Sequence, residues 1–105
     1  FEHFVIQEII AYLGYKNSNE KLSCWHTYTG NEVDAIIGNR VAIEIKSADM
    51  VQPKHLKGLR VFAEEYPNFD RMIVSWDPIN RKTEDGIRII FIRDFLQELW
   101  SGKLF

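Results

Sequence analysis

The segment NEVDAIIGNRVAIEIKS, residues 31–47, decides the fold of this chain. Apolar residues alternate with other residues on both sides of Gly38-Asn39-Arg40, which is typical of two strands joined by a tight turn. A three-residue loop pairs Ile37 with Val41 and leaves one face apolar, whereas a two-residue turn would mix apolar and polar residues on both faces. The pattern therefore predicts a β-hairpin whose strands are joined by the three-residue loop.

This register sets Asp34 opposite Glu44, with about 5 Å between the two Cβ atoms. Two ionised carboxylates at that separation repel each other by about 3 kcal/mol at an effective dielectric constant of roughly 20. Lys46 lies on the same face, two residues beyond Glu44, and offsets part of this repulsion. A divalent cation between the acids would offset more of it, and hard oxygen ligands of this kind suit Mg²⁺.

Two acids and a lysine in this arrangement would serve the hydrolysis of phosphodiesters. The metal would polarise the phosphoryl oxygen and lower the pKa of a bound water. Lys46 would orient or deprotonate that water, or stabilise the charge that develops on the phosphate. The alternative is a solvated cluster without a metal, because acids and lysines alternate on many surface strands.

The rest of the sequence predicts helices that pack on the faces of this sheet. Residues 1–13 form an apolar helix that we expect to end at Gly14 and to be buried on more than one side. Asp94 is the predicted N-cap of a last helix. The other predicted elements are a helix over residues 53–65 and strands over residues 22–27, 32–37, 41–46, 72–76 and 87–92. The expected fold class is α/β, with a central mixed β-sheet flanked by helices.

The composition is that of one globular domain over residues 1–105. Hydrophobic residues make up 46% of the chain and charged residues 27%, which excludes extended disorder. The net charge of −2 excludes a protein that is basic over its whole surface. No apolar run reaches the roughly 18 residues of a membrane-spanning helix, so no membrane association is expected. The single cysteine, Cys24, indicates a reducing compartment and a cytoplasmic location, and we expect it to lie in the core with Trp25, Trp76 and Trp100.

Two features of the sequence resemble known families. Asp34, nine further residues and then Glu44-Ile45-Lys46 resemble the core motif of the PD-(D/E)XK nuclease superfamily. Longer stretches, over essentially the whole chain, are similar to the C-terminal domain of uncharacterised prokaryotic AAA+ ATPases: FEHFVIQEIIAYLGY, CWHTYTGNEVDAIIG, VAIEIKSADMVQPKHLKGLRVFAEE and IRDFLQELWSG. One departure is Trp25-His26, because the similar domains usually have arginine after the aromatic residue.

The resemblance implies a restriction-endonuclease-like (PD-(D/E)XK) core and the residues of its site. Asp34 and Glu44 would be metal ligands, together with the Ile45 carbonyl, and the metal would be Mg²⁺ or Mn²⁺. Lys46 would be the catalytic lysine, and Glu8 on the preceding helix would complete the acidic set. The chain would be the C-terminal part of a longer polypeptide, whose upstream AAA+ ATPase module binds ATP.

Two further groups of side chains have alternative interpretations. Glu8 lies on the apolar side of its helix, so it is either a site acid beside Lys46 or a buried acid with its own partner. Glu2 is expected at a frayed, exposed terminus. Residues 40–60 hold five Lys or Arg and two Asp or Glu. Within them Lys57 and Arg60 share a helix face, which would either follow a nucleic-acid backbone or be an ordinary solvated face.

The sequence thus predicts a Mg²⁺-dependent nuclease-like domain C-terminal to an AAA+ ATPase module. It would hydrolyse DNA phosphodiester bonds as an endonuclease or exonuclease. The alternative is a catalytically inactive module of the same fold, which binds DNA or a protein partner and regulates the ATPase.

Overall fold

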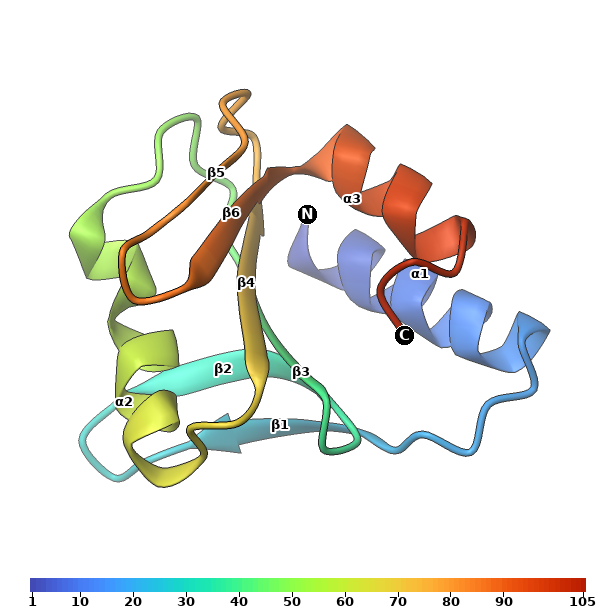
Figure 1. Cartoon of the computed structure of the whole chain (residues 1–105), viewed down its shortest axis with the longest axis horizontal. Helices are drawn as coiled ribbons and strands as arrows, with labels where there is room; N and C mark the ends of the chain where they lie inside the picture. Colours follow the sequence, from blue (N-terminus) through green and yellow to red (C-terminus); the bar gives the residue numbers. More distant parts are fainter.

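The chain folds around a six-stranded mixed sheet with helices on both faces (Figure 1). The computed structural model describes all 105 residues. Its elements are α1 (Glu2–Tyr15), β1 (Leu22–His26), β2 (Glu32–Ile37), β3 (Val41–Ile45), the 3-10 helix η1 (Pro53–Leu56), α2 (Lys57–Glu65), β4 (Asp70–Ser75), β5 (Arg81–Lys82), β6 (Ile87–Phe91) and α3 (Ile92–Trp100). The predicted α/β fold class, with a central mixed sheet flanked by helices, is confirmed.

The strand order is β1-β2-β3-β4-β6-β5. β1, β2 and β3 form an antiparallel meander, whereas β3, β4 and β6 are parallel neighbours at the centre of the sheet. Ile37 pairs with Val41, so the register that the alternation predicted for the hairpin is confirmed. Residues 72–75 of β4 are fully covered on both faces, which explains the unbroken apolar run of this central strand.

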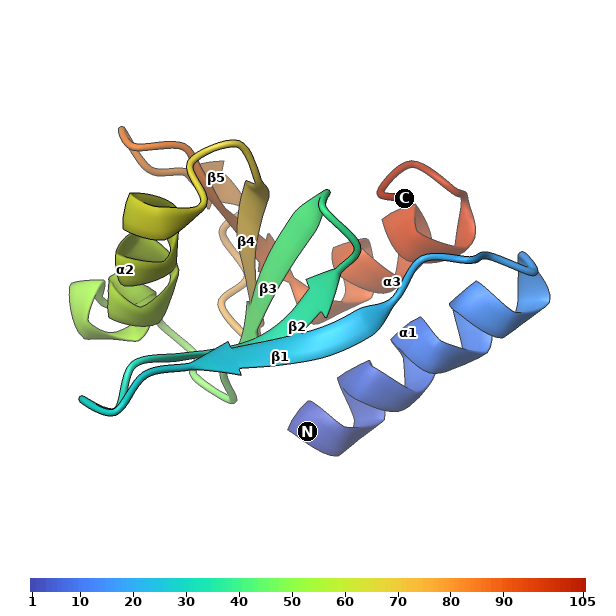
Figure 2. The same ribbon diagram turned by 90° about the horizontal axis from the view of Figure 1, so that it is seen from below.

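Each face of the sheet has its own hydrophobic core. Figures 1 and 2 show α2 on one face and α1 with α3 on the other. The larger core lies under α1 and α3 and includes Val5, Ile9, Ala35, Ile43 and Phe95. The smaller core lies under α2 and includes Val33, Ile36, Leu59, Phe62 and Ile73. The strands of the sheet therefore bury side chains on both sides, and polar residues between them need partners.

β2 contains a β-bulge next to Asp34. Ser23 pairs with Ile36, and Trp25 pairs with Val33. The one residue of β1 between them, Cys24, therefore lies opposite two residues of β2, Asp34 and Ala35. The extra residue reverses the alternation, because Ala35 packs in the core under α1 and α3 whereas Val33 packs in the core under α2. The regular alternation that the sequence predicts for residues 32–37 is therefore wrong at Asp34, where the bulge lies.

The first helix differs from its prediction in its end and in its exposure. α1 continues through Gly14 to Tyr15, and Asn17, with φ of 56°, adopts the left-handed conformation beyond the helix end. Phe4 and Ile10 are 50% and 46% exposed, so α1 is buried along one stripe only. Asp94 is not an N-cap, because α3 begins two residues earlier and the Asp94 carboxylate accepts a hydrogen bond from Asn80.

Two expectations about single residues were also wrong. Cys24 is exposed, since it lies on the edge strand β1. Trp76 and Trp100 are 45% and 41% exposed, although Trp100 packs edge-on against Tyr12 of the larger core, and Trp25 packs against Phe62 of the smaller core. No helix of the structure combines the length and the apolar character needed to cross a membrane.

We expect Gly58→Ala to destabilise the fold and Gly14→Ala to stabilise it. A Cβ atom at Gly58 would lie 2.2 Å from the Glu32 carbonyl oxygen, so α2 would have to move away from β2, at a cost of about 2 to 3 kcal/mol. A Cβ atom at Gly14 meets no atom within 4 Å, and alanine in a helix gains about 0.5 to 1 kcal/mol over glycine. Urea unfolding of the two variants measures both effects, and equal stabilities would contradict the close packing of α2 on β2.

Candidate active site

Asp34 is held against β3 by the backbone of that strand. Its Oδ2 atom accepts a hydrogen bond of 2.8 Å from the Ile45 N–H. The paired residues of β2 and β3 end at Ala35 and Ile43, so the carboxylate of Asp34 meets a backbone donor of β3 just beyond the last pair. The bulge in β2 and this hydrogen bond together fix the side chain of Asp34 beside Glu44.

Glu44 is a buried acid whose charge is poorly compensated. Only 3% of its surface is exposed, and its Oε1 atom has no hydrogen-bond partner. Burial, the hydrogen bond with Asp34 and the negative charge of Asp34 together raise the pKa of Glu44 to about 9. Without a cation, Glu44 therefore keeps its proton at neutral pH, and a cation bound at Oε1 would displace that proton.

Lys46 is the cation of this site. Its Nζ atom lies 3.9 Å from Glu44 Oε2, and 39% of its side chain is exposed. The ammonium group therefore reaches both the buried acid and the solvent. This position allows Lys46 to contact a molecule that approaches the two carboxylates from outside.

The two candidate acids of α1, Glu2 and Glu8, have different surroundings. Glu2 is exposed in the first turn of α1, as expected for a terminus, and burial and the negative charges of Asp34 and Glu32 raise its pKa. Glu8 lies about 9 Å further along the helix axis. There it accepts a hydrogen bond of 3.2 Å from the indole N–H of Trp100. The structure does not bring Glu8 to the predicted site.

The candidate metal ligands are the carboxylates of Asp34 and Glu44 and the Ile45 carbonyl, and no three His, Cys, Asp or Glu side chains lie together as a metal-binding group. Two carboxylates still fit Mg²⁺, which binds few protein ligands and keeps several waters. The unpaired Oε1 of Glu44 is a ligand atom without another function in the fold. The donor set is thus compatible with Mg²⁺ or Mn²⁺.

The basic residues predicted on α2 have different surroundings. Lys57 is exposed at the start of α2 and forms no ion pair. Arg60 is ion-paired with Asp85, with 3.0 Å between Nε and Oδ2, so its charge is largely compensated. His55, before α2, accepts at its Nδ1 atom a hydrogen bond of 2.9 Å from the Gln52 N–H. Burial and the positive charges of Lys54 and Lys46 lower the pKa of His55.

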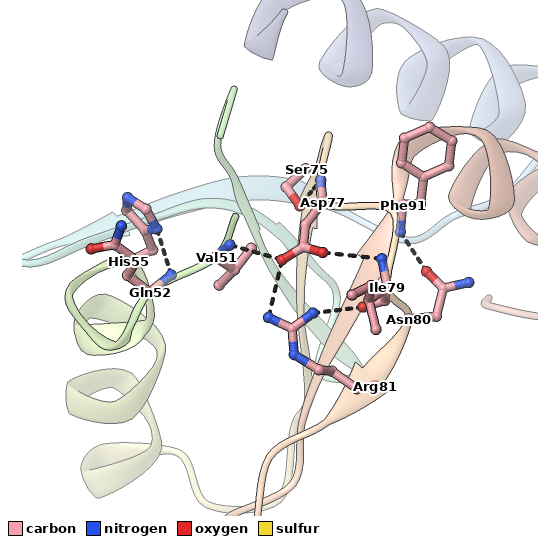
Figure 3. A network of polar contacts seen from close by, with 9 residues as sticks. All are labelled: Val51, Gln52, His55, Ser75, Asp77, Ile79, Asn80, Arg81 and Phe91. Atoms are coloured by element: carbon pink, nitrogen blue, oxygen red, sulfur yellow. Dashed lines mark hydrogen bonds and ion pairs between the residues drawn. The ribbon is translucent and has the colours of Figure 1, made fainter. Parts of the chain in front are cut away.

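Asp77 fixes the loops that follow β3 and β4 (Figure 3). Its buried carboxylate accepts hydrogen bonds from the Val51 N–H at 2.8 Å, the Ile79 N–H at 3.0 Å and the Arg81 guanidinium at 3.0 Å. The hydrogen bond from Arg81 is the main reason that the pKa of Asp77 falls to about 2. Because Val51 lies in the segment after Lys46, this network anchors the chain that leaves the candidate site.

Metal-free stability should fall as the pH rises, because of Glu44. The folded protein keeps a proton on Glu44 up to a pKa of about 9, whereas the unfolded chain releases it near 4.5, so stability decreases between these two values. Glu44→Gln removes this loss and should be more stable than the wild type at pH 8 by about 1 kcal/mol or more. Thermal melts in EDTA between pH 5 and pH 8 measure the difference. Glu84→Gln, at an exposed position, is the control, and parallel pH profiles of wild type and Glu44→Gln would contradict the burial of a protonated acid.

Asp77→Ala should destabilise the fold by about 2 to 4 kcal/mol, because it leaves the Val51 and Ile79 N–H groups and the Arg81 guanidinium without their acceptor. The stability that Asp77 contributes is fully present above its ordinary pKa of 3.8 and is lost as the pH falls through about 2. Urea unfolding at pH 7 and pH 3 should therefore show a smaller difference from the wild type at pH 3. Asp49→Ala, at an exposed residue of the same loop, should change stability little at either pH.

The chain matches one described protein family. Residues 1–95 match a family model described as "Domain of unknown function (DUF4143)". Comparison with curated proteins and with solved structures finds no significant match. Since the match extends over nearly the whole sequence, the chain belongs to the DUF4143 domain family.

Proposed function

We propose that this chain is a PD-(D/E)XK-type nuclease domain that hydrolyses DNA phosphodiester bonds with Mg²⁺ or Mn²⁺. The observation that carries the proposal is the buried Glu44, with its unpaired Oε1, beside Asp34 and within 3.9 Å of Lys46. A buried acid next to a second acid lowers stability, and such arrangements are typical of functional sites. A mixed sheet with helices on both faces is compatible with a restriction-endonuclease-like core.

The metal would bind to Asp34, Glu44 and the Ile45 carbonyl. When bound, Mg²⁺ supplies a Lewis acid that polarises a phosphoryl oxygen and acidifies a coordinated water. The fit rests on the unpaired Oε1 of Glu44, which no group of the protein satisfies. Asp34 keeps its carboxylate in place through Ile45, so the two ligands stay together whether or not a substrate is present.

Lys46 would act on the reacting phosphate. Its ammonium group, which is partly exposed, would hold a non-bridging phosphate oxygen and stabilise the negative charge that develops during the displacement. Glu2 would adjust the negative potential at the entrance to the site. Of the two basic residues on α2, Lys57 is the better candidate for a contact with the DNA backbone, since Asp85 already neutralises Arg60.

The proposal includes an upstream AAA+ ATPase module in the same polypeptide, which would bind ATP there. A competing function is a catalytically inactive module that binds a partner and regulates this ATPase. An exposed apolar groove of about 620 Å³ between α1 and α3 favours this alternative, with Phe4, Trp76 and Leu96 in its lining. Exposed apolar patches of this kind mark protein interaction surfaces.

Nuclease activity should depend on Lys46 and on the metal. Supercoiled plasmid and single-stranded DNA, incubated with 5 to 10 mM Mg²⁺ or Mn²⁺ (roughly ten times a weak Kd), should be cleaved by the wild type and not in EDTA. Lys46→Ala should lower the cleavage rate by about 100-fold or more. Lys21→Ala removes the same charge at an exposed position far along the chain and should leave the rate unchanged.

Metal binding is measured separately from cleavage by thermal melts. A metal at ten times its Kd stabilises the wild type by about 1.4 kcal/mol, and Asp34→Asn should abolish this stabilisation. Cleavage that survives in Lys46→Ala would indicate a contaminating nuclease. A wild type that neither cleaves DNA nor gains stability from Mn²⁺ would overturn the proposal in favour of the inactive module.

A further inference from the structure

A basic cavity lies at the end of the sheet where the parallel strands begin, opposite to the end that holds the candidate active site. It has a volume of about 240 Å³, and residues at the beginning of β3, β4 and β6 contribute to its lining. Val41, Met72 and Leu104 form its apolar part. Because β3 runs from Val41 to Ile45, the cavity is separated from the metal ligands by about 13 Å of strand. We call it the amino-edge cavity.

Four cationic side chains from different segments line the amino-edge cavity. They are Arg71 on β4, Lys82 on β5, Arg88 on β6 and Lys103 in the segment after α3. Asp70 is the only acidic residue of the lining. Segments that are far apart in the sequence therefore bring four positive charges into one cavity. Such a convergence is not expected of an ordinary solvated surface.

The two arginines of the cavity are held in place. The side chain of Arg71 is only 12% exposed and donates a hydrogen bond to the Asp85 carbonyl. Asp85 also pairs with Arg60, so a single carboxylate compensates two guanidinium groups. Arg88 is paired through both of its terminal nitrogens with Glu98 of α3.

The two lysines are free to bind a ligand. Neither Lys82 nor Lys103 has a carboxylate within ion-pair distance, and both are exposed. The cavity thus combines a fixed guanidinium whose charge is only partly compensated with two mobile ammonium groups. This combination suits a compact anion with several oxygen atoms.

We propose that the amino-edge cavity binds a phosphate group, as inorganic phosphate, pyrophosphate or the phosphate of a mononucleotide. A volume of about 240 Å³ is below the range of pockets that enclose drug-sized ligands, so it suits the phosphate itself. The site does not depend on the proposed nuclease activity, because it shares no residue with the metal ligands or with Lys46.

The role of Asp70 distinguishes a phosphate site from a general excess of positive charge. A carboxylate in the lining repels an anion in the cavity, so its neutralisation should tighten phosphate binding. Removal of the two lysines should have the opposite effect. Neutralisation of Asp70 should thus tighten phosphate binding, and removal of the two lysines should weaken it. If phosphate were attracted only by the overall positive charge, removal of two lysines outside the cavity would weaken binding equally.

Calorimetric titration with inorganic phosphate, pyrophosphate and AMP, at constant ionic strength in chloride buffer, tests the proposal. Lys82→Ala/Lys103→Ala should weaken phosphate binding by about tenfold or more, since each charge-assisted hydrogen bond contributes at least that factor. Asp70→Asn should tighten it. Lys21→Ala/Lys54→Ala loses the same charge at two exposed positions outside the cavity and should bind as the wild type does.

Comparison of the ligands identifies the source of the phosphate group. Tighter binding of AMP than of inorganic phosphate would assign the cavity to nucleotides, and equal or weaker binding of AMP would assign it to free phosphate or pyrophosphate. The proposal is overturned if no ligand binds to the wild type at 10 mM (roughly the weakest useful Kd). It is also overturned if the control pair weakens binding as much as Lys82→Ala/Lys103→Ala.

Discussion

The hydrogen bond from the Ile45 N–H to Asp34 Oδ2 is the interaction on which the candidate site depends. It forms where the pairing of β2 with β3 ends, and the bulge in β2 aims the Asp34 side chain at the free backbone donor. Without the extra residue, the alternation of β2 would continue and Val33 would remain under α1 and α3. One inserted residue thus moves Val33 to the core under α2 and leaves the Asp34 carboxylate fixed beside Glu44.

The fold tolerates this acid pair because its stability comes from elsewhere. Two apolar cores enclose the central strands, and the Asp77 network ties the loops after β3 and β4 together. The two buried acids have opposite effects. Asp77 accepts three hydrogen bonds and its pKa is lowered, whereas Glu44 has an unpaired oxygen and a raised pKa. Asp77 therefore stabilises the loops, whereas Glu44 lowers the stability of the fold. Residues that lower stability in this way are typical of functional sites.

The hairpin register could be predicted from the sequence, because only one loop length keeps the apolar residues of both strands on one face. The bulge could not, since one extra residue leaves no mark on the pattern of a six-residue strand. Periodicity gives the angle of a side chain around a helix but not the partner that it meets, so the hydrogen bond from Trp100 to Glu8 could not be predicted. The Asp77 network could not be predicted, because loops bring Val51 and Arg81 to Asp77 and periodicity does not predict the conformation of loops.

The net charge of −2 does not show how the charged residues are distributed between the two ends of the parallel strands. Asp34 and Glu44 lie where β3 ends, and Arg71 and Arg88 lie where the neighbouring parallel strands begin. Asp34 repels a phosphate group that approaches the candidate site without a cation. The cations at the opposite end of the strands do not reduce this repulsion, because they lie farther away than the Debye length, which is about 8 Å at physiological salt. Any reaction of a phosphodiester at Glu44 must therefore recruit its positive charge locally, from Lys46 and a bound metal. An anion in the amino-edge cavity would be screened from these acids in the same way.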